Sequence, residues 1–265
     1  MKKGLTILVV FGLLLTMSFN VLAQDDVELT IAGGSVGIEL ELTKKAARMF
    51  EEKHPNVTVN VLSTPDLAND RLSLYLQFFE AESPKVDVYQ IDVIWPGDLA
   101  QHFLDLYEYG AEEVVDDHFQ AIVENNTVDG RLVAMPWFTD AGLLYYRTDL
   151  LEKYDLEVPE TWEDLERAAK TIQTGERAAG NQDFWGYVWQ GNAYEGLTCD
   201  ALEWVYSNGG GTIVNKDKEI TINNEKAIEA VNMAADWVGH ISPPGVTGLV
   251  EESTRKMFEA GNAAF

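Results

Sequence analysis

The hydrophobic residues at the start of the sequence follow two different periods. Val27, Leu29 and Ile31 alternate as in a β-strand, whereas the apolar positions between 42 and 50 recur at helical spacing. The two periods then repeat, and they predict strands over 27–31, 57–61 and 86–91 and helices over 42–50 and 72–79. Strands that alternate with helices pair in parallel through right-handed crossovers. We therefore predict an α/β fold with a parallel sheet.

The loops that follow the predicted strands are the first place to look for function. In open parallel sheets, ligands bind beyond the carboxyl ends of the strands. Three loops leave those ends, at 33–39, 63–66 and 92–97. Side chains in these loops are therefore better functional candidates than side chains along the helices.

A second unit is predicted to begin after Pro136, with a tight crossover near 136–141. Thr161 and Asn224 are suitable N-caps for two of its helices, and Pro243-Pro244 is expected to close the second one. The rest of the pattern predicts strands over 132–135 and 184–189, an apolar segment over 143–146, helices over 165–172, 197–205 and 227–238, and a hairpin over 213–222.

The first 23 residues have the order of a secretory signal. Lys2 and Lys3 precede the apolar run Leu5–Leu15, and a small residue, Ala23, stands where cleavage is expected. The apolar run is short for a membrane span, although an uncleaved N-terminal anchor has a similar pattern. We predict that residues 1–23 are a signal peptide and that the protein is exported and soluble.

Composition and charge narrow the classes of function. Of the 265 residues, 46% are hydrophobic, and 44 acidic side chains outnumber 19 basic ones, for a formal net charge of −25. A surface of that charge repels nucleic-acid phosphates and anionic lipids, so we expect no nucleic-acid partner. The single cysteine, Cys199, excludes an internal disulfide, and the four histidines lack the spacing of metal ligands. We predict neither a metal nor a cofactor.

A hydrolase motif is present in part. Residues 33–37 match the G-x-S-x-G pattern of a nucleophile elbow and lie between a predicted strand and a predicted helix. No earlier strand can supply the second oxyanion-hole amide, and His240 is the only late histidine. A glycosidase would need a carboxylate pair, for which Asp92 and Asp140 are candidates by position. A glycine-rich turn is favoured, and a secreted carbohydrate-active hydrolase stays open as an alternative.

Aromatic residues next to carboxylates give the clearest indication of a ligand. Sugars need this combination, because their C–H faces stack on rings while their hydroxyls bond to carboxylates, amides and arginine. The sequence has seven tryptophans and ten tyrosines. Trp204 and Trp237 are assigned to the core by their helical spacing, and Trp162 to packing at a helix N-terminus. The candidate groups in predicted loops are Asp92 with Trp95, Trp137 and Phe138 with Asp140, and Trp189 and Tyr194 with Glu195.

Several longer motifs point to one family. They are FEEKHPNV at 50–57, IDVIW at 91–95, DAGLLYYR at 140–147, PETWEDL at 159–165, FWGYVWQG at 184–191, YEGL at 194–197 and GNAAF at 261–265. With these motifs the sequence resembles the extracellular solute-binding proteins of sugar ABC transporters, and most of all the trehalose/maltose-binding group. The motifs extend along nearly the whole sequence after residue 23.

This resemblance implies a two-lobed periplasmic-binding-protein fold of type II, with lobes at 24–136 and 137–265 joined by a hinge. It implies a sugar-binding protein rather than an enzyme, a membrane permease as partner, and a periplasmic or extracellular location. We expect a monomer. Carried over position by position, the implied sugar contacts are Glu39, Arg71, Asp92, Phe138 (where the group has a tyrosine) and Asp140.

Two further expectations concern the ligand and the chain end. The sequence does not choose among trehalose, maltose and other disaccharides, and an acidic aromatic cleft would also suit a cation such as a polyamine. The chain ends at 261–265, where a strand is predicted to begin. We therefore expect an N-terminal fragment in which both lobes are incomplete and sugar binding is weak.

Overall fold

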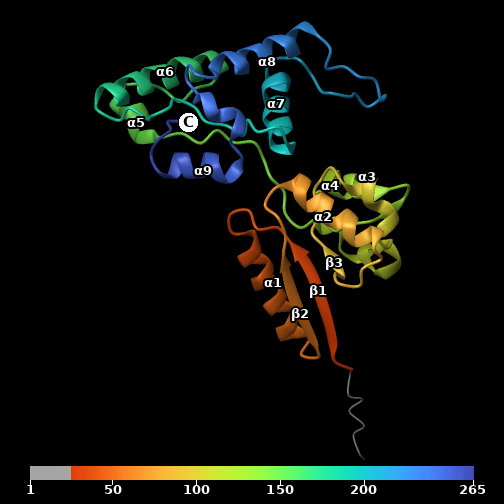
Figure 1. Cartoon of the computed structure of the whole chain (residues 1–265). Coiled ribbons are helices and arrows are strands. Elements are labelled where there is room, and N and C mark those ends of the chain that lie inside the picture. The colour runs from red at the N-terminus through yellow and green to blue at the C-terminus, as the bar shows by residue number, and fades with distance from the viewer. Residues whose placement is uncertain (1–24) are drawn as a thin grey trace, which may run out of the picture.

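A three-stranded parallel sheet organises the first lobe of the computed structural model, which describes residues 25–265 (Figure 1). Strand β1 (Val27–Gly33) lies between β2 (Val57–Ser63) and β3 (Val88–Tyr89). Both pairings are parallel, as the alternation of strands and helices predicted. The third strand is shorter than predicted: its pairing with β1 covers Val88 and Tyr89 only, and Val86 packs in the core outside it. The predicted signal peptide lies outside the described residues.

Helices α1 (Glu39–Lys53) and α2 (Ala68–Glu80) connect the three strands. Helix α2 carries Tyr75, which is fully buried, into a core with Trp95 and Leu99. Helix α1 buries less, because Leu42, Met49 and Phe50 remain exposed and Thr43 is its one buried residue. Both helices begin near the carboxyl ends of the strands, so their first residues lie where a ligand is expected.

The remainder of the first lobe is built from short elements. They are α3 (Pro96–Leu99), the 3-10 turns Ala100–His102, Leu106–Tyr109, Ala111–Glu113 and Val115–Asp117, α4 (Gln120–Asn125), β4 (Thr127–Val128) and β5 (Arg131–Leu132). The strand predicted over 132–135 is wrong in its bounds, because β5 ends at Leu132. It pairs with β4 through Asp129-Gly130, whose two positive φ angles are those of a tight hairpin turn.

The second lobe is mainly helical. Thr161 caps α6 (Trp162–Ala178) and Asn224 caps α8 (Glu225–Trp237), as predicted. Each side chain accepts the backbone N–H three residues further along, at 3.1 and 3.0 Å. Helix α8 ends at Trp237, before the expected stop at Pro243-Pro244. The elements are α5 (Thr148–Lys153), α6 (Trp162–Ala178), α7 (Glu195–Ser207), α8 (Glu225–Trp237), the 3-10 turn Pro244–Gly248 and α9 (Glu251–Glu259).

Tryptophans form the centre of the second core. Trp204 packs edge-to-face on Trp189 and Trp237, with ring centroids 4.9 and 5.8 Å apart, and Trp162 contacts Trp237. The core assignment of Trp204 and Trp237 is therefore confirmed, and Trp162 packs against that core as a partly buried residue. The segment predicted as a strand over 184–189 is extended but forms a single parallel bridge, Trp185↔Ala263, with the last residues of the chain. The hairpin predicted over 213–222 likewise holds one bridge.

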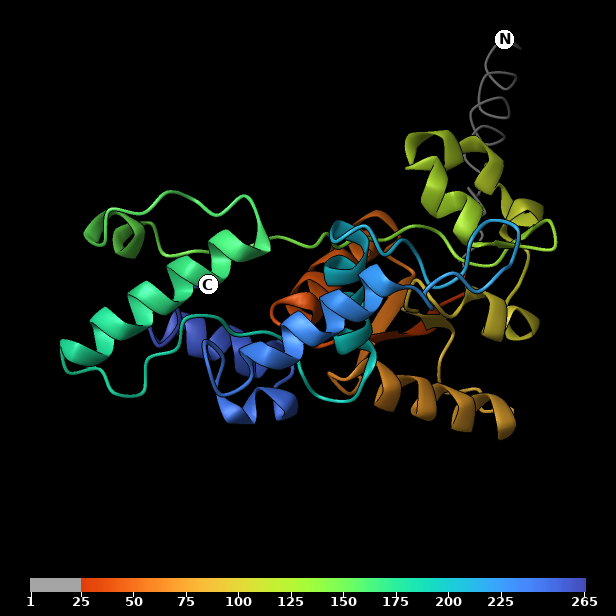
Figure 2. The same ribbon diagram turned by 90° about the horizontal axis from the view of Figure 1, so that it is seen from above.

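Residues 133–147 carry the chain from the first lobe to the second without a helix or strand (Figures 1 and 2). Leu143 and Tyr145 in this crossover are largely exposed, so the apolar segment predicted over 143–146 is not a core element. The crossover is anchored where the Arg147 N–H donates to the Ala264 carbonyl at 3.0 Å. Within residues 25–265, every helix is too short or too polar to span a bilayer.

Candidate functional site

Three polar side chains converge on Gly34 at the carboxyl end of β1. A Cβ placed on Gly34 would overlap the Glu39 carboxylate and lie 2.8 Å from Arg71 Nη1 and 3.1 Å from Gln90 Nε2. Glu39 opens α1, Arg71 lies in the first turns of α2, and Gln90 follows β3. The Gly34 N–H donates to Gln90 Oε1 at 3.0 Å. The cluster therefore lies at the strand ends, where ligands of parallel sheets bind.

This cluster contains polar atoms that are buried but not bonded. Among residues 25–265, Glu39 Oε2 and Arg71 Nε and Nη1 have no hydrogen-bond partner, although Arg71 is only 7% exposed. Burial raises the pKa of the Glu39 carboxyl, the Asp140 charge raises it further, and Arg71 and Gln90 oppose the rise. Most buried polar atoms in proteins are bonded, and an acceptor next to donors is an arrangement that a ligand hydroxyl can bond to on both sides.

Trp95 does not offer a stacking surface, which corrects the expectation that it would contact a sugar. Its ring is 2% exposed and packs edge-to-face on Tyr75, with centroids 6.0 Å apart. The Arg71 guanidinium lies over the ring, 5.5 Å from its centroid. Trp95 directly precedes α3, and Pro96 and Leu99 of that helix are buried, which keeps the ring in the core. The buried Trp95 ring thus packs against the Arg71 guanidinium.

The other first-lobe candidates lie around this cluster. Asp92 is half-buried after β3, and its Oδ1 accepts only a long hydrogen bond, 3.4 Å, from the Ile94 N–H. Phe138 and Asp140 are exposed on the crossover. Because the Asp140 charge acts on Glu39, the crossover brings this second carboxylate close to the cluster.

Helix α7 contributes Tyr194 and Glu195 from the second lobe. Tyr194, the residue before the helix, is 9% exposed and lines an apolar cavity of about 370 Å³ within its own lobe, with Leu197, Ala201 and other residues. Tyr194 thus packs within its own lobe. Glu195 accepts the Cys199 S–H at 2.8 Å. The thiol of Cys199 has a pKa raised to about 12, by partial burial, by Glu195, and by Asp200 and Asp92. Since Asp92 belongs to the first lobe, this face of α7 is turned toward it.

Two acidic residues of α7 were missed by the sequence analysis. Asp200 accepts the Gln190 N–H at 2.9 Å, and burial raises its pKa to about 7, with further contributions from Glu203 and Glu251. Burial also raises the pKa of Glu203, whose carboxylate occupies the space beside Gly142 of the crossover. Positions 195, 199 and 203 share one helix face at i, i+4 spacing, and this spacing was the available signal for Glu203.

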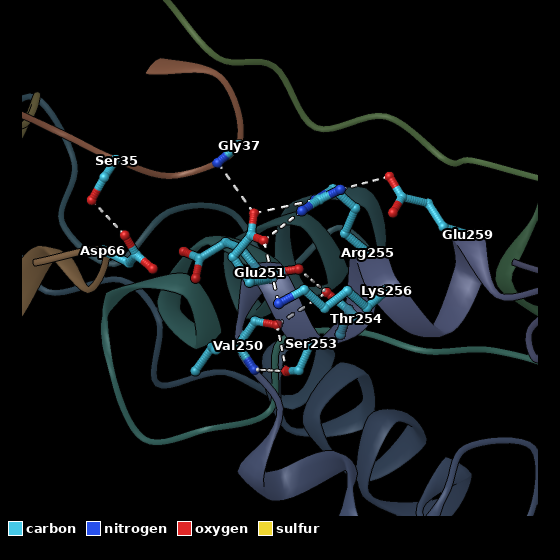
Figure 3. Close-up of polar contacts among 11 residues, drawn as sticks. Ser35, Gly37, Asp66, Val250, Glu251, Ser253, Thr254, Arg255, Lys256 and Glu259 are labelled. Carbon is cyan, nitrogen blue, oxygen red and sulfur yellow. Dashed lines mark hydrogen bonds and ion pairs between the residues drawn. The ribbon is translucent and has the colours of Figure 1, made fainter. Parts of the chain in front are cut away.

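A hydrogen bond joins the two lobes beside the cluster (Figure 3). The N–H of Gly37, in the loop after β1, donates to Glu252 Oε1 at 3.2 Å across 215 positions of sequence. Arg255 binds the same Glu252 through its guanidinium and also binds Glu259 at 2.6 Å. Gly37 has φ of +57°, a conformation that glycine adopts without strain.

The hydrolase motif is not assembled as a catalytic pair in the described structure. Ser35 Oγ lies 2.7 Å from the Thr64 carbonyl oxygen and 2.6 Å from Asp66 Oδ1. His240, in the turn after α8, bonds through its ring to the Asp236 carbonyl of that helix, so it is not the partner of Ser35. Among residues 25–265, no group of histidine, cysteine and carboxylate side chains is arranged to hold a metal ion.

Comparison with known proteins gives consistent matches. Residues 35–265 match the model of a family described as bacterial extracellular solute-binding protein. A probable ABC transporter-binding protein of Deinococcus radiodurans is 49% identical over 253 residues, which are 95% of this chain and 60% of that protein. The maltodextrin-binding protein MdxE of Bacillus subtilis is 27% identical over 80% of this chain and 49% of its own length.

A solved structure shows the same similarity in three dimensions. Maltose-bound T. maritima MalE3 superposes with a TM-score of 0.83 at 39% sequence identity, and the match covers 90% of this chain and 60% of that one. The chain thus spans about 60% of the length of the Deinococcus protein and of MalE3, and 49% of the length of MdxE. The two-lobed α/β fold expected from the motifs is confirmed by this likeness.

Proposed function

The chain belongs to the bacterial extracellular solute-binding protein family, and from this premise we propose that it binds a sugar for an ABC transporter. The sugar would lie between the lobes and be delivered to a membrane permease. The observation that carries the proposal is the cluster at Gly34, where a carboxylate and a guanidinium are buried with atoms left unbonded. A sugar hydroxyl both donates and accepts, so adjacent hydroxyls could satisfy Glu39 and Arg71 together.

The proposed contacts come from both lobes. Glu39 and Arg71 would bind hydroxyls in the buried part of the site, and Asp92 and Asp140 would accept further hydroxyls at its edge. The half-exposed ring of Phe138 is suited to stacking on a C–H face of the sugar. From the second lobe, Glu195 remains a candidate, because it lies on the face of α7 turned toward Asp92. Tyr194 and Trp95 would act through packing.

We propose a disaccharide such as maltose or trehalose as the ligand. The relatives include a maltodextrin-binding protein and a structure with maltose bound, which supports an α-linked glucose unit. The protein would act as a monomer in the periplasm or outside the cell, after export through the signal peptide at 1–23. The family consists of transport proteins rather than enzymes, so we propose binding without turnover.

The test is a thermal-shift and calorimetric screen of the protein from residue 24 onward. A ligand that binds only the folded state, present at 100 times its Kd, stabilises it by about 2.7 kcal/mol. We expect maltose or trehalose to raise the melting temperature, and putrescine to have no effect, because Arg71 would repel a cation. Glucose release from maltose would instead favour the hydrolase alternative. Stabilisation by putrescine alone would favour a cation-binding protein.

A further inference from the structure

Two residues of the Gly34 cluster, Gln90 and Gly34 itself, are joined by a hydrogen bond. We propose that Gln90 and Gly34 are positioning residues that fix the Glu39 carboxylate and the Arg71 guanidinium in the geometry that selects a polyhydroxyl ligand. This inference rests on the proposed sugar-binding function, and it names the residues on which the affinity of that site depends.

Gln90 is held in place from three sides. Its backbone N–H donates to the Ala32 carbonyl at 2.9 Å, and its own carbonyl accepts the Tyr75 hydroxyl at 3.0 Å. Burial raises the pKa of Tyr75 to about 12, so this hydroxyl stays protonated and keeps donating. The side-chain Oε1 accepts the Gly34 N–H at 3.0 Å. With its carbonyl end fixed, the amide places its Nε2 in the same space beside Gly34 that the Glu39 carboxylate occupies.

The Gln90 amide opposes the rise in the pKa of Glu39. Burial and the nearby Asp140 carboxylate raise the pKa of Glu39, whereas Arg71 and the Gln90 amide lower it. An ionised carboxylate accepts hydrogen bonds from two hydroxyls, and a protonated one loses part of that capacity. Gln90 therefore keeps Glu39 in its ligand-binding form over a wider range of pH.

Gly34 supplies the space in which these side chains meet. Its φ is not in the left-handed region, so the backbone would accept alanine. The three atoms nearest to the Cβ of that alanine would be side-chain tips, those of Glu39, Arg71 and Gln90. Tips of long side chains move aside at little cost in stability. Gly34→Ala should therefore leave the fold intact while it displaces the binding groups.

The experiment is a double-mutant cycle measured by calorimetry with the sugar that gives the largest thermal shift. Gly34→Ala should weaken binding about tenfold or more in the wild-type background, and much less in a Glu39→Ala background, because the two residues act through one contact. Gly245→Ala is the matched control, since its Cβ would meet nothing within 4 Å and it lies in the second lobe. It should bind like the wild type.

The pH dependence of binding separates positioning from a structural effect. In the wild type, affinity should fall as the pH drops through the Glu39 pKa. In Gln90→Leu, the same fall should begin at a higher pH, because the amide no longer lowers that pKa. An equal loss at every pH, or equal losses from Gly34→Ala in both backgrounds, would overturn the inference alone. If the wild type binds no sugar at all, both this inference and the proposed function fail.

Discussion

Replacing Asp200 with asparagine should stabilise the protein at neutral and alkaline pH. Asp200 is partly buried in α7, and its pKa is raised from 3.8 to about 7, first by burial and then by Glu203, Glu251 and Glu195. The folded state therefore keeps a proton that the unfolded state releases between pH 4 and 7. The protonated Asp200 side chain stabilises the folded state at low pH. This contribution to the free energy of unfolding is lost as the pH rises through that window.

The size of the effect follows from the pKa difference. A shift from 3.8 to about 7 corresponds to about 4 kcal/mol at about 1.4 kcal/mol per unit, which is an upper bound. Asparagine carries no charge, and its side-chain oxygen can still accept the Gln190 N–H. The difference in unfolding free energy between Asp200→Asn and the wild type should be near zero at pH 4 and about 2–4 kcal/mol at pH 8.

Urea denaturation at a series of pH values measures this difference. Asp149→Asn serves as a control of opposite sign, because Arg147 lowers the pKa of Asp149. The stability from that exposed ion pair is present above pH 4 and lost below it, so the control should be slightly destabilised at pH 8. The reasoning is refuted if Asp200→Asn is destabilised by the same amount at pH 5 and pH 8.

Three further predictions concern the site and the contact between lobes. Asp92→Ala should leave folding intact and cost about 1.5–3 kcal/mol of sugar binding by calorimetry, the range for hydrogen bonds to a charged group; unchanged affinity would remove Asp92 from the site. Cys199, with a pKa of about 12, should react with a thiol reagent at pH 8 about a thousandfold more slowly than a free thiol. Glu195→Gln should speed that reaction, and an equal rate in both proteins would contradict the Glu195 contact. Glu252→Ala removes the acceptor of the Gly37 N–H, which is a contact between the lobes. It should change the free-energy difference between lobe arrangements by about 1 kcal/mol, measured as a changed small-angle X-ray scattering profile. Glu259→Ala, which removes the other partner of Arg255, should scatter like the wild type.

The sequence predicted those parts of the fold that depend on local periodicity. The strands β1 and β2, the helices α1 and α2, and the caps at Thr161 and Asn224 follow from neighbouring residues alone. The strands expected at 132–135 and 184–189 were not formed as such. Their residues are apolar because they enter a core, and burial in a core does not require a sheet partner.

The site was predicted less completely, for a related reason. Glu39 and Arg71 were named through the resemblance to a family, and no spacing in the sequence links them to Gln90. They meet because three strand ends lie side by side, which is a tertiary property. Trp95 was misjudged because loop position does not reveal the direction of a side chain, and here the ring is covered by Arg71. The lobe bounds at 24–136 and 137–265 stay a prediction.

The central claim is that a sugar binds at the Glu39–Arg71 cluster. The most direct test compares maltose and trehalose binding by calorimetry in the wild type, Glu39→Gln and Glu41→Gln. Glu41 is an exposed carboxylate in the same first turn of α1 and keeps the net charge change identical. We predict saturable binding by the wild type, a loss of about tenfold or more in Glu39→Gln, and no change in Glu41→Gln. Equal affinity in all three proteins, or no binding by a wild type that unfolds cooperatively, would contradict the account.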